Sequence, residues 1–173
     1  MDKLRILLAD DDPECRRTIF RFLNTAGHEC QSAETGEQTL AIAFRHNPDV
    51  ILLDLRLGDM SGFQVMKFLS HNALTASIPI LILTGEPAAE DLLRDAASNF
   101  NAKAYIRKPV DLVELLSAIK SAAGSRKTDV PGQPWMIQRG AVRIDLRRRE
   151  VLVGGAPLKL GPKRFEILCA LAR

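Results

Sequence analysis

Pro48-Asp49-Val50-Ile51-Leu52-Leu53-Asp54 decides the fold of the amino-terminal part of the chain, because four successive apolar residues lead directly into a carboxylate. An uninterrupted apolar run of this length is typical of a strand that is buried on both faces. Similar runs occupy residues 4–8 and 78–83, a weaker one occupies 104–106, and a half-polar strand is expected near 28–33. The sequence therefore predicts five strands in this part of the chain.

The segments between these strands have apolar residues at helical spacing. The apolar positions are Ile19, Phe22 and Leu23; Leu40, Ala43 and Phe44; Val65, Met66 and Leu69; Leu92, Leu93 and Ala96; and Leu112, Leu115, Leu116 and Ile119. Asp12 before Pro13, and Asp111 before Leu112, are typical of residues that cap a helix start. Five alternations of strand and helix predict an α/β fold, a doubly wound parallel sheet with helices on both faces.

Chemically distinctive side chains follow four of the expected strands. Asp10 and Asp11 follow the first, Asp54 the third, Thr84 the fourth and Lys108 the fifth. Ligands of open parallel sheets bind outside the carboxyl ends of the strands, where these residues would meet. Each of them alone has an ordinary explanation as an exposed or capping residue at a strand end; their concentration at one edge is what indicates a site.

Three carboxylates in one place repel one another, which favours binding of a cation. Carboxylate oxygens suit Mg²⁺, a lysine offers a positive charge to phosphoryl oxygens, and a threonine hydroxyl donates a hydrogen bond. Asp54 would then act as a carboxylate nucleophile in phosphoryl transfer. Asp12 also belongs to the acidic run, but its position before Pro13 favours capping over metal binding.

Composition sets limits on the class of protein. With 46% hydrophobic and 26% charged residues among 173, the chain is typical of a globular protein and not of a disordered one. No apolar run approaches the roughly 20 residues that span a bilayer, and the start lacks the features of a secretory signal, so we expect a cytoplasmic protein with no membrane contact. Three widely spaced cysteines fit neither a disulfide framework nor a zinc site.

Residues 1–123 resemble the receiver domain of two-component response regulators, a flavodoxin-like fold. The motifs that carry the resemblance are Ile6-Leu7-Leu8-Ala9-Asp10-Asp11; Pro48 to Asp54; Ser61-Gly62; Ile78-Pro79-Ile80-Leu81-Ile82-Leu83-Thr84-Gly85; and Ala104-Tyr105-Ile106-Arg107-Lys108-Pro109. Five separate motifs in the family's order make the match specific.

The resemblance implies roles for individual residues. Asp54 would accept the phosphoryl group from a phosphohistidine on a sensor histidine kinase. Asp10, Asp11, Asp54 and the backbone carbonyl of Arg56 would hold Mg²⁺. The phosphoryl group would contact Thr84 and Lys108, while Tyr105 would turn inward as part of the switch. Phosphorylation would pair two receivers into a homodimer.

The chain departs from the family pattern at three places. Gly58 stands where the family usually has proline, which predicts a more flexible loop after Asp54. Asn101 replaces the usual glycine, a tolerable change because asparagine also enters the left-handed region. The stretch from Thr84 to Lys108 is about two residues longer than is common, which makes the fourth helix uncertain.

Residues 124–134 predict a linker, since glycine, proline and charged residues are frequent there. Residues 126–173 contain 11 basic and 4 acidic side chains, the sign of charge expected of a segment that meets nucleic acid, although a solvated basic surface is an equal alternative. Strands are expected at 141–146, 150–153 and 157–160, with a turn at Gly154-Gly155 and a helix from Pro162.

Residues 135–173 resemble the start of the winged-helix DNA-binding domain of OmpR/PhoB-type regulators. The resembling motifs are Val142-Arg143-Ile144-Asp145, Arg148-Arg149-Glu150-Val151, Gly155 to Leu160 and Pro162 to Leu168. A small antiparallel sheet and the first helix are expected. The recognition helix and wing that read DNA in this family are not among these residues, so we expect an incomplete domain with no complete DNA-binding site. A solvated turn is a better explanation of Arg147-Arg148-Arg149 than a contact with phosphates.

The function that these features predict is a response regulator of a two-component phosphorelay, which controls transcription. It would not be an enzyme beyond catalysing its own phosphorylation and dephosphorylation. One alternative is a receiver that docks a partner protein and carries an inert carboxyl-terminal segment. Another is a haloacid-dehalogenase-type phosphatase, but the Asp-x-Asp-x-Thr motif of that class is not matched by Asp10-Asp11-Asp12-Pro13-Glu14, which lacks the threonine.

Overall fold

The computed structural model describes residues 3–85, 99–126, 136–145 and 150–158, together with Leu160, Gly161, Arg164 and Leu168. The chain divides into two compact units, residues 1–128 and 129–173. The predicted linker falls on this division. Its residues 127–134 lie outside the described residues, while residues 124–126 belong to the last helix of the first unit.

The first unit contains a five-stranded parallel sheet in the order β2-β1-β3-β4-β5, which is the flavodoxin-like order. The strands are β1 (Arg5–Ala9), β2 (Glu29–Ala33), β3 (Val50–Asp54), β4 (Ile80–Thr84) and β5 (Ala102–Arg107). Every residue of the central strands β3 and β4 is buried. The predicted fold class, with a continuous apolar strand at the centre of the sheet, is confirmed.

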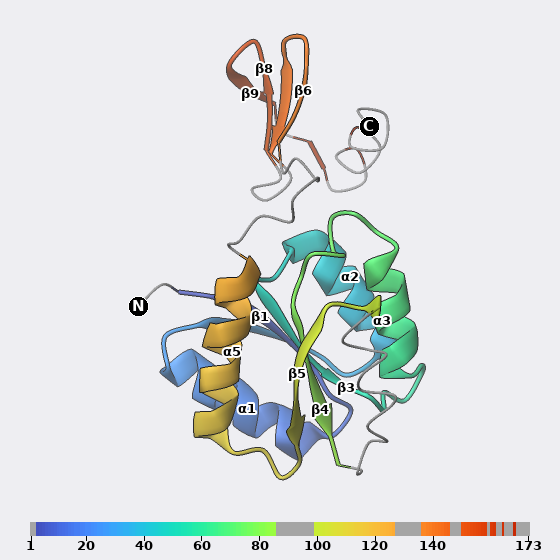
Figure 1. Ribbon diagram of the computed structural model, residues 1–173, viewed down its shortest axis with the longest axis vertical. Coiled ribbons are helices and arrows are strands. Elements are labelled where there is room, and N and C mark those ends of the chain that lie inside the picture. The colour runs from blue at the N-terminus through green and yellow to red at the C-terminus, as the bar shows by residue number, and fades with distance from the viewer. Residues whose placement is uncertain are drawn as a thin grey trace. The chain divides into compact units, whose positions relative to one another are not determined.

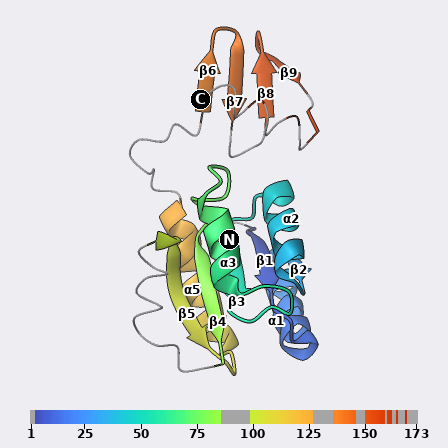
Figure 2. The same cartoon turned by 90° about the vertical axis from the view of Figure 1, so that its right-hand side faces the viewer.

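Four described helices cover the two faces of the sheet (Figures 1 and 2). They are α1 (Pro13–Thr25), α2 (Gly36–His46), α3 (Gly62–Ser70) and α5 (Leu112–Arg126). Helices α1 and α5 pack on one face, and α2 and α3 pack on the other. The fourth predicted helix, around Leu92, Leu93 and Ala96, lies outside the described residues.

The alternation of strand side chains separates two apolar cores. Leu7 and Ile51 point toward α2 and α3, where they join Val65 and Met66 of α3. The neighbouring strand residues face the other way and pack on α1 and α5; they are Ile6, Leu8, Val50 and Leu52, which join Ile19, Leu23, Leu115 and Ile119. Burial on both faces fixes the register of each strand, because a shift by one residue would exchange the two cores.

The predicted caps fix where two helices begin. The Asp12 carboxylate accepts hydrogen bonds from the backbone N–H groups of Glu14 and Cys15 at the start of α1. Asp111 accepts from the first turn of α5 at 2.8 and 3.0 Å. Asn101 has a positive φ of 56°, as its replacement of glycine predicted.

The second unit is a four-stranded antiparallel sheet in the order β6-β7-β8-β9. Its strands are β6 (Met136–Arg139), β7 (Val142–Asp145), β8 (Glu150–Val153) and β9 (Ala156–Leu158). Gly154 and Gly155 both have positive φ in the predicted turn. Strand β6 was not predicted from the sequence. The turn expected at the arginines 147–149 and nearly all of the helix expected from Pro162 lie outside the described residues. None of the helices in the described ranges is both long and apolar enough to cross a bilayer.

Candidate functional site

The polar side chains of the first unit meet at the carboxyl edge of the parallel sheet. Asp10 directly follows β1, Asp54 and Thr84 are the last residues of β3 and β4, and Lys108 directly follows β5. Asp10 is 0% exposed, and Asp54 and Thr84 are each 6% exposed, whereas Asp11 lies in the open at the rim. The strand ends therefore gather the residues that the sequence singled out.

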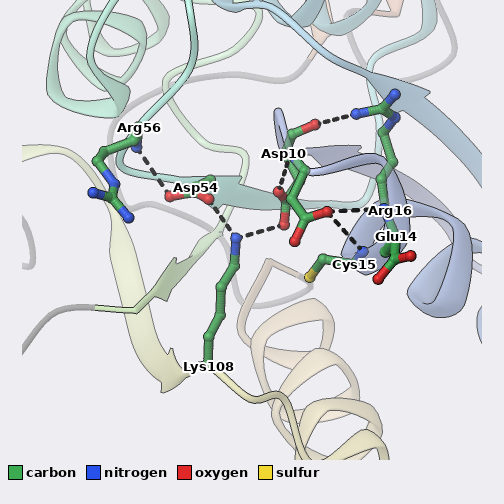
Figure 3. A network of polar contacts seen from close by, with 8 residues as sticks. Asp10, Glu14, Cys15, Arg16, Asp54, Arg56 and Lys108 are labelled. Atoms are coloured by element: carbon green, nitrogen blue, oxygen red, sulfur yellow. Dashed lines mark hydrogen bonds and ion pairs between the residues drawn. The ribbon is translucent and has the colours of Figure 1, made fainter.

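Lys108 joins the two buried carboxylates of this pocket (Figure 3). Its Nζ lies 2.8 Å from Oδ2 of Asp10 and also forms an ion pair with Oδ2 of Asp54. The backbone N–H of Lys108 donates to the carbonyl of Thr84 at 2.7 Å, which fixes the start of the side chain. Burial alone would lower the pKa of the amine, but the close contacts with the two carboxylates and their negative charges outweigh it and raise the pKa above its ordinary value.

The three carboxylates can approach a single cation. One oxygen from each of Asp10, Asp11 and Asp54 lies within 4.8 Å of the others. Oδ1 of Asp10 accepts from the N–H of Asp12 at 3.0 Å. Among the described residues no well-directed hydrogen bond reaches the buried Oδ2, whose contact is the ion pair with Lys108. Carboxylate oxygens are the hard ligands that Mg²⁺ prefers, and Oδ2 of Asp10 still has room for a further partner.

The loop between β3 and α3, residues 55–61, closes back on the end of β3. The N–H of Arg56 donates to Oδ1 of Asp54 at 2.9 Å, and Arg56 forms an isolated bridge with Ser61. The N–H of Gly62 donates to the carbonyl of Leu55 at 2.8 Å. A Cβ at Gly62 would lie 2.5 Å from the backbone oxygen of Asp54, so only glycine permits this close approach. That the Arg56 carbonyl is a metal ligand stays a prediction.

Two residues of α1 contact Asp10 without having been singled out in the sequence. Nη1 of Arg16 donates to the Asp10 carbonyl at 2.7 Å, and its Nη2 lies 3.3 Å from Oε2 of Glu34. Cys15 lies beside the Asp10 carboxylate; burial first, and then the hydrogen bond and negative charge of Asp10, raise the pKa of its thiol to about 12. Both residues lie in the first turn of α1, five and six residues after Asp10, and this nearness in sequence is the signal that could have indicated them.

Tyr105 lies on β5, paired with Ile82 of the neighbouring strand, and is 60% exposed. The ring is therefore on the outside in this structure, and its inward movement stays a prediction. Thr84 ends β4, and residues 86–98 that follow it lie outside the described residues. About half of the stretch from Thr84 to Lys108, which was expected to be longer than usual, falls in that range.

Comparison with known proteins identifies the first unit. The family model described as "Response regulator receiver domain" matches residues 6–120. This chain belongs to the response regulator receiver family. The match covers all of the parallel sheet except Arg5, and it includes Asp10, Asp54, Thr84 and Lys108.

Similar proteins include transcriptional regulators of the same family. The chain is 31% identical over 163 residues to the phosphate regulon transcriptional regulatory protein PhoB of Pseudomonas aeruginosa, covering 94% of this chain and 69% of that protein. It is 33% identical over 174 residues to the DNA-binding dual master transcriptional regulator RpaA of Synechocystis, covering 98% and 70%. The similarity to regulators of OmpR/PhoB type therefore extends beyond the receiver into the second unit.

A solved receiver domain adds information on the metal. The receiver domain of a sensor histidine kinase from Pseudomonas aeruginosa PAO1 matches with a TM-score of 0.63 and 25% identity, over 71% of this chain and 99% of that one. Its magnesium ion is coordinated in the active-site cleft.

Proposed function

We propose that this receiver accepts a phosphoryl group on Asp54 from a phosphohistidine of a sensor histidine kinase. The observation that carries the proposal is the contact of one amine, Lys108, with two buried carboxylates at the ends of different strands. Burying a charged carboxylate costs free energy unless the charge is paired, so two buried acids that share one amine indicate a specialised site. A phosphoryl-transfer site needs this combination of a nucleophile, a cation site and a mobile positive charge.

In the proposed reaction an oxygen of Asp54 attacks the phosphorus, and the bond from phosphorus to the histidine nitrogen breaks as the histidine leaves. Asp10, Asp11, Asp54 and the carbonyl of Arg56 would hold Mg²⁺, which supplies positive charge to the phosphoryl oxygens. The amine of Lys108 moves from the Asp54 carboxylate to a phosphoryl oxygen, and the hydroxyl of Thr84 donates to another. Tyr105 then fills the space that Thr84 leaves.

The experiment is labelling of the chain by a small phosphodonor such as acetyl phosphate, followed by intact-mass analysis. We expect a gain of one phosphoryl group that requires Mg²⁺ and is lost in Asp54→Asn. Asp49→Asn is the matched control, because Asp49 directly precedes β3 and pairs with Arg5 away from the pocket. Labelling of Asp54→Asn at the rate of the unchanged chain would contradict the assignment.

The same chain is not expected to be an enzyme toward other substrates. A phosphatase of the haloacid-dehalogenase type would use the residue after the first strand as its nucleophile, which here is Asp10. Both carboxylates pair with Lys108, but the Asp10 side chain is 0% exposed and that of Asp54 is 8% exposed, so Asp54 is the more accessible nucleophile. Hydrolysis of a small phosphate ester that survives Asp54→Asn but is lost in Asp10→Asn would favour the phosphatase.

We also propose that phosphorylation controls transcription, through pairing of two receivers and a change in DNA binding. The similarity to PhoB and RpaA supports this, as does the excess of basic residues in 126–173. Gel-shift assays with and without phosphodonor test it, and the shift should weaken as salt increases. A phosphorylated chain that dimerises but causes no specific shift would favour the alternative, a receiver that docks a partner protein.

A further inference from the structure

The carboxylate of Asp59 ties the β3–α3 loop to a different element, the start of α2. Its Oδ1 accepts from the N–H of Gly36 at 2.7 Å, and its Oδ2 accepts from the N–H of Glu37 at 3.0 Å. Oδ1 also accepts from the N–H of Met60 at 2.9 Å. Asp59 is exposed to solvent, yet it holds together segments that are more than 20 residues apart in the chain.

These bonds complete the first turn of α2. The first four N–H groups at a helix start have no partner within the helix, and three of them here belong to Gly36, Glu37 and Gln38. Asp59 takes the first two, and the side-chain oxygen of Thr35 takes the third at 3.2 Å. The hydrogen bonds from Glu37 and then Gly36 lower the pKa of the Asp59 carboxyl, so the group stays ionised at the positive end of the helix.

Packing reinforces the same junction. A Cβ at Gly36 would lie 2.2 Å from Cγ and 2.6 Å from Sδ of Met60, so the methionine side chain occupies the space that glycine leaves. Met60 packs in turn against the core beneath α2 and α3. The loop is therefore attached to α2 by a polar contact at Asp59 and an apolar contact at the next residue.

The attachment of the loop to α2 affects the candidate metal site, because the loop carries Arg56. Arg56, three residues before Asp59, bonds to the Asp54 carboxylate through its N–H. Gly58 lies between them and allows the loop more backbone freedom than a proline would. We propose that Asp59 is a positioning residue for the metal and phosphoryl site, which holds the loop so that its backbone meets Mg²⁺ in the required geometry. The inference rests on the proposed function, in which the Arg56 carbonyl is a metal ligand.

The test compares Mg²⁺ dependence among four forms of the whole chain. Groups that orient metal ligands typically change metal affinity by about 10- to 100-fold when removed. We expect Asp59→Ala to raise the Mg²⁺ concentration for half-maximal labelling by about tenfold, while the rate at saturating Mg²⁺ changes less than about twofold. Thr35→Ala removes the other cap of the same helix turn, and Glu37→Gln removes a nearby negative charge. Both controls should keep the Mg²⁺ dependence of the unchanged chain.

Calorimetric titration of Mg²⁺, without any phosphodonor, separates this inference from the proposed function. If the unchanged chain binds Mg²⁺ but is not labelled, the proposed phosphorylation of Asp54 is wrong. Weaker Mg²⁺ binding by Asp59→Ala would in that case still support the positioning role of Asp59. Asp59→Asn keeps one acceptor oxygen and should give an intermediate affinity; it also serves if the alanine variant does not fold. Equal Mg²⁺ affinity in Asp59→Ala and the unchanged chain, or an equal loss in Thr35→Ala or Glu37→Gln, would overturn the inference.

Discussion

Replacing Lys108 by methionine removes the positive charge that joins two buried acids while keeping a long apolar side chain. In the unchanged chain the amine contacts Asp10 and Asp54, and its side chain is 20% exposed. Methionine fills the same space without a charge. We expect Lys108→Met to lower the free energy of unfolding at neutral pH when Mg²⁺ is removed by a chelator.

The size of the loss follows from the geometry of the acids. Their nearest oxygens lie within 4.8 Å of one another. Two unit charges at about that distance repel by about 3.5 kcal/mol at an effective dielectric constant near 20. Breaking a fully buried pair costs about 3–5 kcal/mol. Because the Lys108 side chain is 20% exposed, solvent screens part of its interaction with the two acids, and we expect a loss of about 2–3 kcal/mol.

Urea unfolding followed by circular dichroism measures this loss, with and without Mg²⁺. Mg²⁺ should stabilise Lys108→Met more than the unchanged chain, since a bound cation replaces the missing charge. Lys103→Met, a change at an exposed lysine of the same strand β5, is the matched control and should have little effect. The reasoning would be refuted if Lys108→Met and the unchanged chain had the same free energy of unfolding in chelator. It would also be refuted if Mg²⁺ raised the free energy of unfolding of both chains by the same amount.

The pH dependence supplies a second measurement of the same contact. The pKa of Lys108 is raised in the folded state above the ordinary 10.5. The stabilisation from its contacts is therefore fully present below pH 10.5 and is lost as the pH rises through the higher pKa of the folded state. The stability difference between the unchanged chain and Lys108→Met should narrow only in that alkaline range. A difference that disappears below pH 10 would show that another group is responsible.

Two further substitutions and one labelling experiment test the surroundings of the site. Gly62→Ala should lower the free energy of unfolding by about 1–3 kcal/mol, because its Cβ would lie 2.5 Å from the carbonyl oxygen of Asp54; an unchanged urea midpoint would contradict the close approach. Ser61→Ala should cost about 1 kcal/mol in the same assay, because it removes the capping box at the start of α3. Cys15 should react with iodoacetamide far more slowly than an ordinary cysteine at pH 8, since a pKa of about 12 instead of 9.0 leaves much less thiolate. Peptide mass mapping measures this rate, and rapid modification of Cys15 in the folded chain would show that its thiol is not shielded.

The sequence was sufficient to predict the parallel sheet because its strands are buried on both faces. A run such as Val50 to Leu53 has few alternatives to a central strand, and both faces of β3 are indeed covered. The end of α5 was predicted less well. Gly124 indicated a break, yet α5 runs to Arg126, since glycine in a helix costs only about 1 kcal/mol and Ala122 and Ala123 before it are buried.

Strand β6 was not predicted because it begins directly after the proline-rich segment that was interpreted as a linker. Its residues, Met136-Ile137-Gln138-Arg139, show no alternation of apolar and polar side chains, and the strand pairs with β7. A short strand at the edge of a sheet depends on its neighbour more than on its own sequence.

The site was predicted as a set of strand ends, but its supporting contacts were not. The parallel topology alone brings Asp10, Asp54 and Lys108 to one edge, so their chemistry could be inferred before any coordinates. Arg16 and Asp59 act through contacts that depend on the packing of α1 and α2, and no local pattern distinguishes them from ordinary charged surface residues. Tertiary contacts of this kind can be found only once the elements are placed.

The charges of the pocket explain why Lys108 has to be movable for the proposed reaction. Three carboxylates and one amine leave a formal charge of −2, which a divalent cation would neutralise. A phosphoryl group on Asp54 then replaces the carboxylate charge by negative oxygens farther from the strand, and the amine that had paired with Asp54 becomes available to meet them. In the proposed reaction the lysine would therefore stabilise the acids before the transfer and the phosphoryl group after it. We expect an arginine at position 108 to do this less well, because its planar, rigid fork favours bidentate contact with one carboxylate. We accordingly expect Lys108→Arg to fold but to be labelled more slowly than the unchanged chain at saturating Mg²⁺, and labelling at an unchanged rate would show that a fixed positive charge is sufficient.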